Sequence, residues 1–402
     1  MRSKKYVIAG FGLLAAAVAL AALGASTASG HGKRSSAKTL VIGAALDLSN
    51  QMSPFDGPAL KAAQLEAKKI NSRGGANKMK IQIKVCDHGL VPAKGTSCAQ
   101  KLISQGAKIL LVTCDVDYAT PAATVALSKK LLTVAPCIGT DQMGPKRFGS
   151  KLGKLAFSFG NVAQDEGAAM AEIAIQKKWK RAFVVTDNLL VYFKNVTQAF
   201  TKRYKQLGGK VVKTESFKNG DKTIGAVARR AAATNAQVIA TSTAFGDWPA
   251  FFAGVRSAGG NQVIMNSWAG DGNYWYPKGV KVSKYWYVTF ASVFGDDPSK
   301  AVRRLIAQMK AGGAAPGTGG FLPGAGAIDA IAAAVKKTKS TNGNKLADAF
   351  LHFKKQATIS GKVSFTKKFH TVFGRAYRVI EVQNNKPRFR RLYTAKKPAN
   401  IG

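Results

Sequence analysis

Apolar and polar positions follow two different periods in turn along most of the chain. Short apolar runs rich in β-branched residues, such as TLVIGAA over 39–45, predict buried strands. After this run, apolar residues recur at spacings of three and four, from Leu60 through Ala63 and Ala67 to Ile70. This spacing predicts a helix with one buried face, which ends before Gly74. Strands and helices that alternate in this way predict a parallel sheet covered on both faces.

The alternation forms two series. The first predicts strands over 39–45, 80–86, 109–113 and 131–134, with helices near 92–104 and 120–130. The second begins after Ser158 and predicts strands over 182–186, 210–217, 238–241 and 263–266, with helices between them. From 284 the pattern changes to a strand over 285–290, three helices, and antiparallel edge strands near 363–365, 377–382 and 388–392. We therefore expect an α/β protein with two doubly wound, Rossmann-like domains, whose ligand lies at the carboxyl ends of the strands.

The N-terminal segment predicts export. Arg2, Lys4 and Lys5 precede an apolar run over 7–23, and small residues up to Ala28 offer a cleavage site. We expect a signal peptide over 1–28 and a polar linker over 29–37, and the alternative is an uncleaved membrane anchor. The expected location is the periplasm, the extracellular space or the cell envelope.

The net charge is unusual for a globular protein. The chain carries 61 Lys and Arg against 20 Asp and Glu, a formal charge of +41. Such a surface attracts polyanions, but exposed clusters such as 177–181 and 388–391 are also compatible with a merely solvated face.

The four cysteines predict two disulfides. An exported protein usually pairs its cysteines, and four of them allow three connectivities. We favour Cys86–Cys98 and Cys114–Cys137, because the second pair would join the ends of neighbouring strands. A zinc site is the weaker alternative, since the spacing typical of zinc ligands is missing from the sequence.

Sequence motifs give little support to an enzyme. The chain has no GKS or GKT of a phosphate-binding loop and no HExxH. We therefore expect a non-enzyme without a metal or cofactor.

Several stretches, in order, resemble one known family. They include ALDLSNQMSPFDGPALKAAQLEAKKINSRGG, KVCDHGLVPAKGTSCAQKLISQGAKILLVTC, FSFGNVAQDEGAAMA and ISGKVSFT. Together they are similar to extracytoplasmic solute-binding proteins of the type I periplasmic-binding fold, in the branched-chain amino acid (Leu/Ile/Val) family of ABC importers. The resemblance covers about 38–395. It implies that the chain crosses between two domains three times, with domain 1 over 38–158 plus 290–360, domain 2 over 159–289 plus 361–395, and a tail over 396–402.

The resemblance also implies where a ligand binds. The family uses loops after the strands of both domains, which correspond here to 47–55, 114–118, 139–141, 187–192, 244–247 and 267–271. The ligand-contacting residues expected in these loops are Asp47, Met52, Asp115, Val116, Asp117, Tyr118, Thr140, Asp141, Tyr192, Phe245, Trp268 and Asp271. Where the family commonly has Ser or Thr, this chain has Asp115, Val116 and Asp117, and two carboxylates there would repel a ligand carboxylate.

Acidic residues concentrate in these predicted loops. Eight of the 20 follow predicted strands, namely Asp47, Asp87, Asp115, Asp117, Asp141, Asp187, Asp247 and Asp271. One interpretation is a ligand with an ammonium group or many hydroxyls; the other is that Asp caps the helices that follow strands.

The expected function is a monomeric receptor that closes on a small polar ligand, an amino acid or a related compound, and delivers it to a membrane ABC permease. Two alternatives stay open: a secreted basic binder of anionic envelope polymer, and a ligand sensor for a signalling partner. No nucleic-acid partner is expected.

Overall fold

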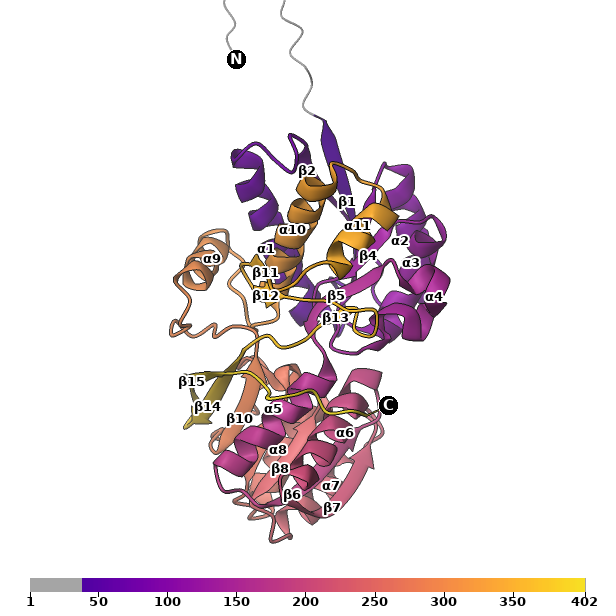
Figure 1. The fold of residues 1–402 in the computed structure, drawn as a ribbon. Coiled ribbons are helices and arrows are strands. Elements are labelled where there is room, and N and C mark those ends of the chain that lie inside the picture. The colour runs from indigo at the N-terminus through magenta and orange to yellow at the C-terminus, as the bar shows by residue number, and fades with distance from the viewer. Residues whose placement is uncertain (1–37, 402) are drawn as a thin grey trace, which may run out of the picture. The chain divides into compact units, whose positions relative to one another are not determined.

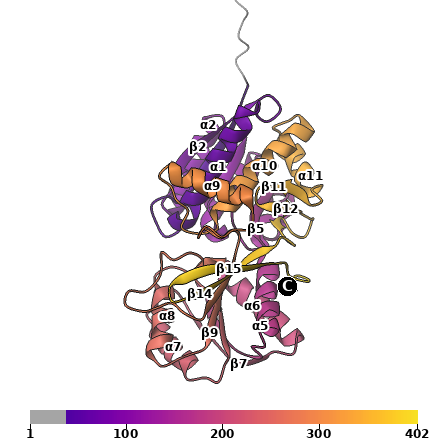
Figure 2. The same ribbon diagram turned by 90° about the vertical axis from the view of Figure 1, so that its left-hand side faces the viewer.

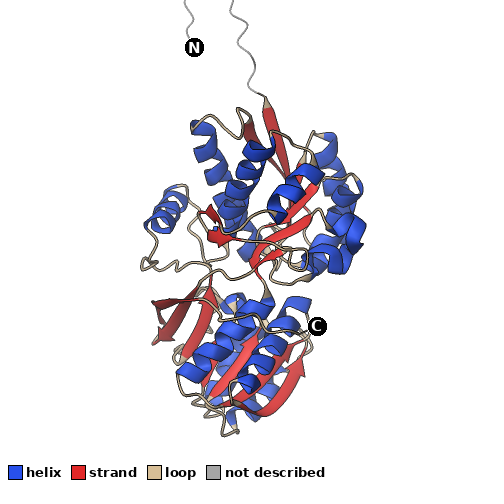
Figure 3. Ribbon diagram, viewed as in Figure 1, coloured by secondary structure: helices blue, strands red, loops and turns tan. Residues whose placement is uncertain are grey.

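The computed structural model describes residues 38–401, and the expected signal peptide and linker lie outside this range. Three sheets form: a six-stranded sheet in the order β13-β5-β4-β3-β1-β2, a seven-stranded sheet in the order β15-β14-β10-β9-β8-β6-β7, and the small pair β11-β12. Figures 1 and 3 show the two large sheets with helices packed against their faces. This confirms the expected α/β fold with two doubly wound sheets.

The six-stranded sheet and its helices are called the first lobe here. Its strands are β1 (Thr39–Leu46), β2 (Lys80–Asp87), β3 (Ile109–Val112), β4 (Leu132–Ala135), β5 (Ala156–Asn161) and β13 (Thr371–Val372). All of its pairings are parallel. Its helices are α1 (Ser53–Ser72), α2 (Pro92–Ser104), α3 (Val116–Ser128), α10 (Phe321–Thr338) and α11 (Gly343–Leu351).

The seven-stranded sheet and its helices are called the second lobe. Its strands are β6 (Arg181–Asp187), β7 (Lys210–Phe217), β8 (Val238–Ser242), β9 (Val263–Asn266), β10 (Tyr285–Thr289), β14 (Tyr377–Gln383) and β15 (Lys386–Tyr393). Its helices are α5 (Ala163–Gln176), α6 (Val191–Gln206), α7 (Ile224–Ala232) and α8 (Asp247–Ser257). Strand β14 pairs antiparallel with β10, and β15 pairs antiparallel with β14, as expected for the C-terminal edge.

The remaining helices and strands belong to neither of these two sets. They are the irregular turn η1 (Gln142–Lys146), α4 (Arg147–Gly153), the short turn η2 (Trp268–Gly270), α9 (Lys300–Ala311), β11 (Gln356–Thr358) and β12 (Gly361–Val363). In Figure 2, α9 lies in front of the first lobe, and β14 and β15 form the part of the second lobe that is nearer the first.

The sequence pattern missed several of these elements. Strand β5 and helix α4 were not expected, and α3 begins at Val116 rather than near residue 120. The expected edge strand near 363–365 is β12, which pairs only with β11. Strand β13 comes from the segment expected in domain 2, yet it pairs with β5 in the first sheet.

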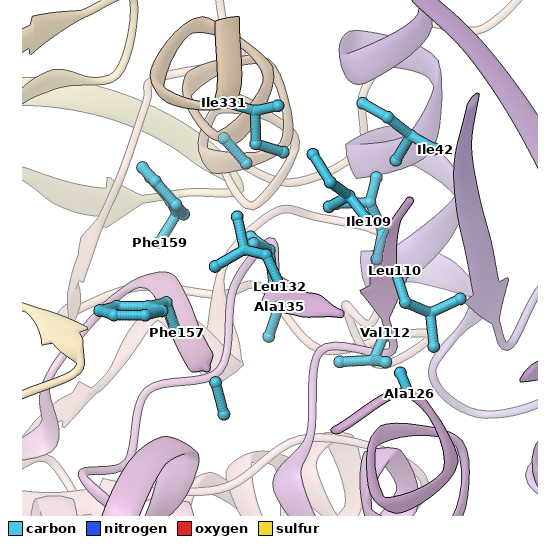
Figure 4. Packing of buried hydrophobic residues seen from close by; sticks show 14 of the residues in the cluster. Ile42, Ile109, Leu110, Val112, Ala126, Leu132, Ala135, Phe157, Phe159 and Ile331 are labelled. Carbon is cyan, nitrogen blue, oxygen red and sulfur yellow. The ribbon is translucent and has the colours of Figure 1, made fainter. Parts of the chain in front are cut away.

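Apolar side chains on both faces hold the first sheet between its helices. Figure 4 shows Ile331 of α10 and Ala126 of α3 on opposite sides of the strands that carry Leu110 and Leu132. All four side chains are fully buried. Helices α1 and α10 approach so closely that a Cβ at Gly324 would lie 2.2 Å from the carbonyl oxygen of Ala59. A glycine is therefore required at this crossing. No helix among residues 38–401 is long and apolar enough to cross a membrane.

Candidate functional site

A small pocket lies where loops of the two lobes meet. It is lined by Met52, Phe55, Cys114, Asp115, Leu190, Tyr192, Phe193, Ala244, Phe245, Trp268 and Ala269. These residues follow β1 and β3 in the first lobe and β6, β8 and β9 in the second. The pocket thus occupies the carboxyl ends of parallel strands from both sheets, where α/β proteins bind ligands.

The pocket is small. Its cavity volume is about 20 Å³, enough for about one water molecule. An amino acid or a ring-sized solute needs more room than this cavity offers.

Aromatic rings from both lobes form the wall of the pocket. Phe55 of α1 contacts Trp268 edge to face, with ring centroids 5.2 Å apart, and Phe245 at 6.4 Å. Tyr192 lies against the other side of the cluster, 5.8 Å from Trp268. The indole nitrogen of Trp268 is buried and has no hydrogen-bond partner. A buried donor without a partner is costly.

Glu166 accepts hydrogen bonds from two residues of this aromatic wall. It is fully buried on α5, where its Oε2 accepts a 2.7 Å hydrogen bond from the Tyr192 hydroxyl and its Oε1 accepts a 2.8 Å bond from the Trp268 amide. Burial raises the pKa of Glu166 to about 8, although the two hydrogen bonds lower it. Sequence reasoning missed Glu166; an acidic residue inside an Ala-rich, apolar helix was the available signal.

Tyr192 reaches the other lobe by packing on a glycine. A Cβ at Gly139 would lie 2.5 Å from the Tyr192 ring. Only glycine therefore lets the ring of α6 lie on the loop after β4.

Asp115 is the only lining residue that carries a carboxyl group. It caps α3, because its side chain accepts hydrogen bonds from the amides of Asp117 at 2.9 Å and Tyr118 at 3.3 Å. Burial, followed by the charge of Asp117, raises the pKa of Asp115 to about 7. Near neutral pH the carboxyl can therefore accept from a ligand ammonium or, when protonated, donate to a ligand oxygen.

The neighbours of Asp115 in the sequence do not line the pocket. Asp117 pairs with Arg147 at 2.5 Å, and Val116 is a fully buried core residue of the first lobe. The hydroxyl of Tyr118 accepts a 2.7 Å hydrogen bond from Gln51. The structure therefore brings only Asp115 of this expected group into the pocket.

Thr140 and Asp141 join the two lobes outside the pocket. Thr140 donates a 2.8 Å hydrogen bond to Asn195 of α6. Asp141 accepts a 2.8 Å bond from Gln164 of α5 and pairs with Lys146 at 3.2 Å.

Asp47 and Asp271 are buried acceptors that shape their own loops. Asp47 accepts hydrogen bonds from the amides of Ser49, Asn50 and Met52. Asp271 accepts from the amides of Gly272 and Gly319 and from the Thr289 hydroxyl. Neither residue lines the pocket.

The other strand-end aspartates also accept from nearby donors. Asp87 accepts from the Leu48 and Gly89 amides, Asp187 from the Leu189 amide and the Thr243 hydroxyl, and Asp247 from the Gly220 amide. These acids therefore accept hydrogen bonds from loop amides and hydroxyls, but of the eight only Asp115 caps a helix, because α1, α2, α6 and α8 have no side-chain cap.

Both favoured cysteine pairs form disulfides in the structure. The Cα atoms of Cys86 and Cys98 are 5.6 Å apart, and those of Cys114 and Cys137 are 4.8 Å apart. The second pair joins the ends of neighbouring strands β3 and β4 and places Cys114 in the pocket wall. Among residues 38–401, no group of three or more His, Cys, Asp or Glu side chains could hold a metal ion.

Solved structures of solute-binding proteins share this fold. The branched-chain amino acid transporter substrate-binding protein LivJ from Streptococcus pneumoniae, solved in complex with isoleucine, superposes with a TM-score of 0.77 at 18% identity, over 89% of this chain and 100% of that one. A solute-binding protein of an ABC transporter from R. palustris, in complex with benzoate, has a TM-score of 0.72 at 18% identity, over 90% of this chain and 98% of that one.

Sequence comparison indicates the same group of proteins. The Leu/Ile/Val-binding protein homolog 3 of Brucella melitensis is 23% identical over 221 residues, which is 55% of this chain and 56% of that protein. The Leu/Ile/Val-binding protein BraC3 of Rhizobium johnstonii is 22% identical over 50% of this chain and 53% of that protein. The chain thus spans about half the length of the curated relatives that it matches.

The family model described as "Periplasmic binding protein" matches residues 39–387, nearly all of the described part of the chain. Two lobes with a pocket at their strand ends fit that match, and the chain belongs to the periplasmic binding protein family.

Proposed function

We propose that this protein is an extracytoplasmic receptor that captures one small solute between its lobes and delivers it to an ABC importer. The observation that carries the proposal is the pocket itself, because its walls come from strand-end loops of both sheets. A ligand that touches both walls stabilises the closed arrangement, which is how a receptor of this kind reports that it is loaded.

The lining favours a ligand with a substantial apolar part. Met52, Phe55, Leu190, Phe193 and Phe245 offer carbon surface, whereas Asp115 offers the one carboxyl group. A branched aliphatic amino acid, or an aromatic acid whose carboxylate meets the protonated form of Asp115, fits this balance better than a polyamine or a sugar. The isoleucine and benzoate complexes of the two structural relatives support these two ligand classes.

Titration calorimetry tests the proposal directly. The panel contains leucine, isoleucine, valine, benzoate and 4-hydroxybenzoate, with glutamate, putrescine and glucose as polar comparators. We expect saturable binding of at least one of the first five, one ligand per chain, with X-ray scattering showing a more compact protein in its presence. Binding confined to the polar comparators would contradict the assigned ligand class, and an unchanged scattering profile would contradict closure.

A matched pair of variants ties the binding to this pocket. Phe245 lines the pocket, whereas Phe389 of β15 is partly buried elsewhere in the second lobe. Phe245→Ala removes apolar contact with the ligand, and a buried phenylalanine is worth about 1.5–3 kcal/mol, so affinity falls about ten-fold or more. Phe389→Ala leaves affinity unchanged.

The basic surface supports a second candidate role, retention at an anionic cell envelope. Lys177, Lys178, Lys180 and Arg181 form an exposed cluster at the end of α5 and the start of β6. Electrostatic attraction of this kind acts over about 8 Å at physiological salt and weakens as salt rises. We therefore expect moderate salt to release the protein from isolated envelopes, whereas release only by detergent would contradict retention by charge.

A further inference from the structure

The pocket between the strand-end loops of the two lobes is called the solute pocket from here on. A second, larger cavity lies beside the segments that connect the two lobes. Its volume is about 520 Å³, within the range of ligand-binding cavities. It is walled by the first residues of α9, the turn between β11 and β12, the segment 374–378 and the end of β15. We call it the hinge cavity. It has no lining residue in common with the solute pocket.

All the charged residues that line the hinge cavity are basic. Lys362, Arg375 and Arg378 line it, together with the hydroxyl-bearing Thr358 and Ser360, and no Asp or Glu does. This composition differs from that of the solute pocket, whose lining has no Lys or Arg and one carboxyl group, that of Asp115.

Arg375 is a buried cation without a carboxylate partner. It is 5% exposed, and its guanidinium donates hydrogen bonds to the Asn161 side chain at 2.8 Å, the Ser360 hydroxyl at 3.0 Å and the Phe159 carbonyl at 2.6 Å. Burial lowers the pKa of Arg375 to about 9, so the group stays charged at neutral pH. Buried charges are normally paired, because neutral acceptors replace only part of the lost hydration.

The other two cations of the hinge cavity differ in their pairing. Arg378 pairs with buried Asp297, its Nε lying 3.0 Å from the carboxylate, and is therefore neutralised. Lys362 is exposed at the rim. Arg375 and Lys362 together leave the cavity with uncompensated positive charge.

We propose that the hinge cavity binds a small multivalent oxyanion, a phosphate or a polycarboxylate, held by Arg375 and Lys362. The guanidinium offers the planar donor geometry that suits carboxylate and phosphate oxygens, and Lys362 adds a point charge. The Thr358 hydroxyl donates to the Gly361 carbonyl and the Ser360 hydroxyl lies 3.0 Å from the Thr358 oxygen, so the wall hydroxyls left to donate to the anion are those of Ser299 and Thr394.

Calorimetry at low ionic strength tests this proposal, with inorganic phosphate and citrate as separate probes and acetate as a monovalent control. We expect one saturable site for phosphate, for citrate or for both, and much weaker binding of acetate. Phosphate without citrate assigns a phosphate site, and citrate without phosphate assigns a polycarboxylate site. No solute is added, so the result does not depend on the proposed transport function.

Two variants and one control locate the site. Arg375→Gln abolishes binding, and Lys362→Gln weakens it by about three-fold or more, because each removes one positive charge of the cavity wall that attracts the anion. Lys336→Gln, at an exposed position on α10 outside the cavity, leaves it unchanged. If Arg375→Gln does not fold, the comparison between the two lysine variants decides.

Two results would overturn the proposal. One is no saturable binding of phosphate or citrate to the folded protein up to about 10 mM, which corresponds to less than about 3 kcal/mol of binding free energy. The other is an equal loss of anion affinity in Lys362→Gln and Lys336→Gln, which would mean that the anion is attracted generally to a protein of formal charge +41.

Discussion

The ring of Phe55 meets the indole of Trp268 edge to face, with the two planes at 88°. Phe55 lies on α1 of the first lobe, and Trp268 follows β9 of the second. Their contact therefore joins the two lobes in the wall of the solute pocket, and it exists only while the lobes are close together.

Removing this contact should favour the open protein. Phe55→Ala deletes one ring of the contact and leaves a gap, so we expect solute affinity to fall about ten-fold or more. X-ray scattering of the variant without solute should show a larger radius of gyration than the wild type. Phe389→Ala, which also removes a phenyl ring, is the control and should change neither quantity. Equal scattering profiles for wild type and Phe55→Ala would contradict a role in closure.

Glu166 makes stability depend on pH. Its pKa rises from 4.5 to about 8 in the folded protein, so between these values the folded state holds a proton that the unfolded chain releases. The free energy of unfolding should therefore fall as pH rises through this window. Burial raises the pKa values of Asp56, Asp115 and Asp271 to about 7, which adds a decline of the same sign.

Glu166→Gln isolates the contribution of this one residue. The amide keeps an acceptor for the Trp268 amide but does not ionise, so its unfolding free energy should decline less between about pH 5 and about pH 8.5. Urea denaturation at several pH values measures the difference. A variant whose stability declines as steeply as that of the wild type would show that Glu166 stays ionised in the fold.

Asp115 and Asp117 should have different effects on solute binding. Asp115 lines the pocket, whereas Asp117 is half-exposed and paired with Arg147. Asp115→Asn keeps a helix-capping oxygen but removes the charge, so we expect solute affinity to change by about 1–3 kcal/mol. Asp117→Asn disrupts a partly exposed ion pair worth at most about 1 kcal/mol and leaves affinity nearly unchanged.

Calorimetry on the two variants, with thermal melts as a folding check, separates the roles. A larger effect on affinity from Asp117→Asn than from Asp115→Asn would mean that the ligand binds beside Asp117 and outside the pocket.

The sequence predicted the framework better than the site. Buried strands such as TLVIGAAL have a strong local signal, and the alternation with helices gave both sheets. Strand β13 was not predicted, because its two residues are too few to show a periodic pattern and its partner strand is distant in the sequence. The site loops were expected from the family resemblance, and ten of the eleven lining residues fall within them. Phe193 is the exception.

The orientation of side chains within those loops could not be predicted. Asp47 and Asp271 look like ligand contacts in the sequence, yet both turn toward backbone amides of their own loops. Glu166 shows the reverse case, because its role depends on Tyr192 and Trp268 arriving from other segments of the chain. Contacts of this kind are set by tertiary packing.

The two disulfides should separate stability from binding. Each closes a short loop, with a sequence separation of 12 for Cys86–Cys98 and 23 for Cys114–Cys137, and loops of these lengths give about 3 kcal/mol of stabilisation by chain entropy. Replacing either pair by alanine should lower the free energy of urea unfolding by about this amount.

Cys114 also lines the solute pocket, whereas neither Cys86 nor Cys98 does. The Cys114→Ala, Cys137→Ala protein should therefore lose solute affinity as well, because the ends of β3 and β4 are no longer joined next to Asp115. The Cys86→Ala, Cys98→Ala protein is the matched control and should bind solute as the wild type does. An equal loss of affinity in both proteins would attribute the effect to general loosening of the first lobe.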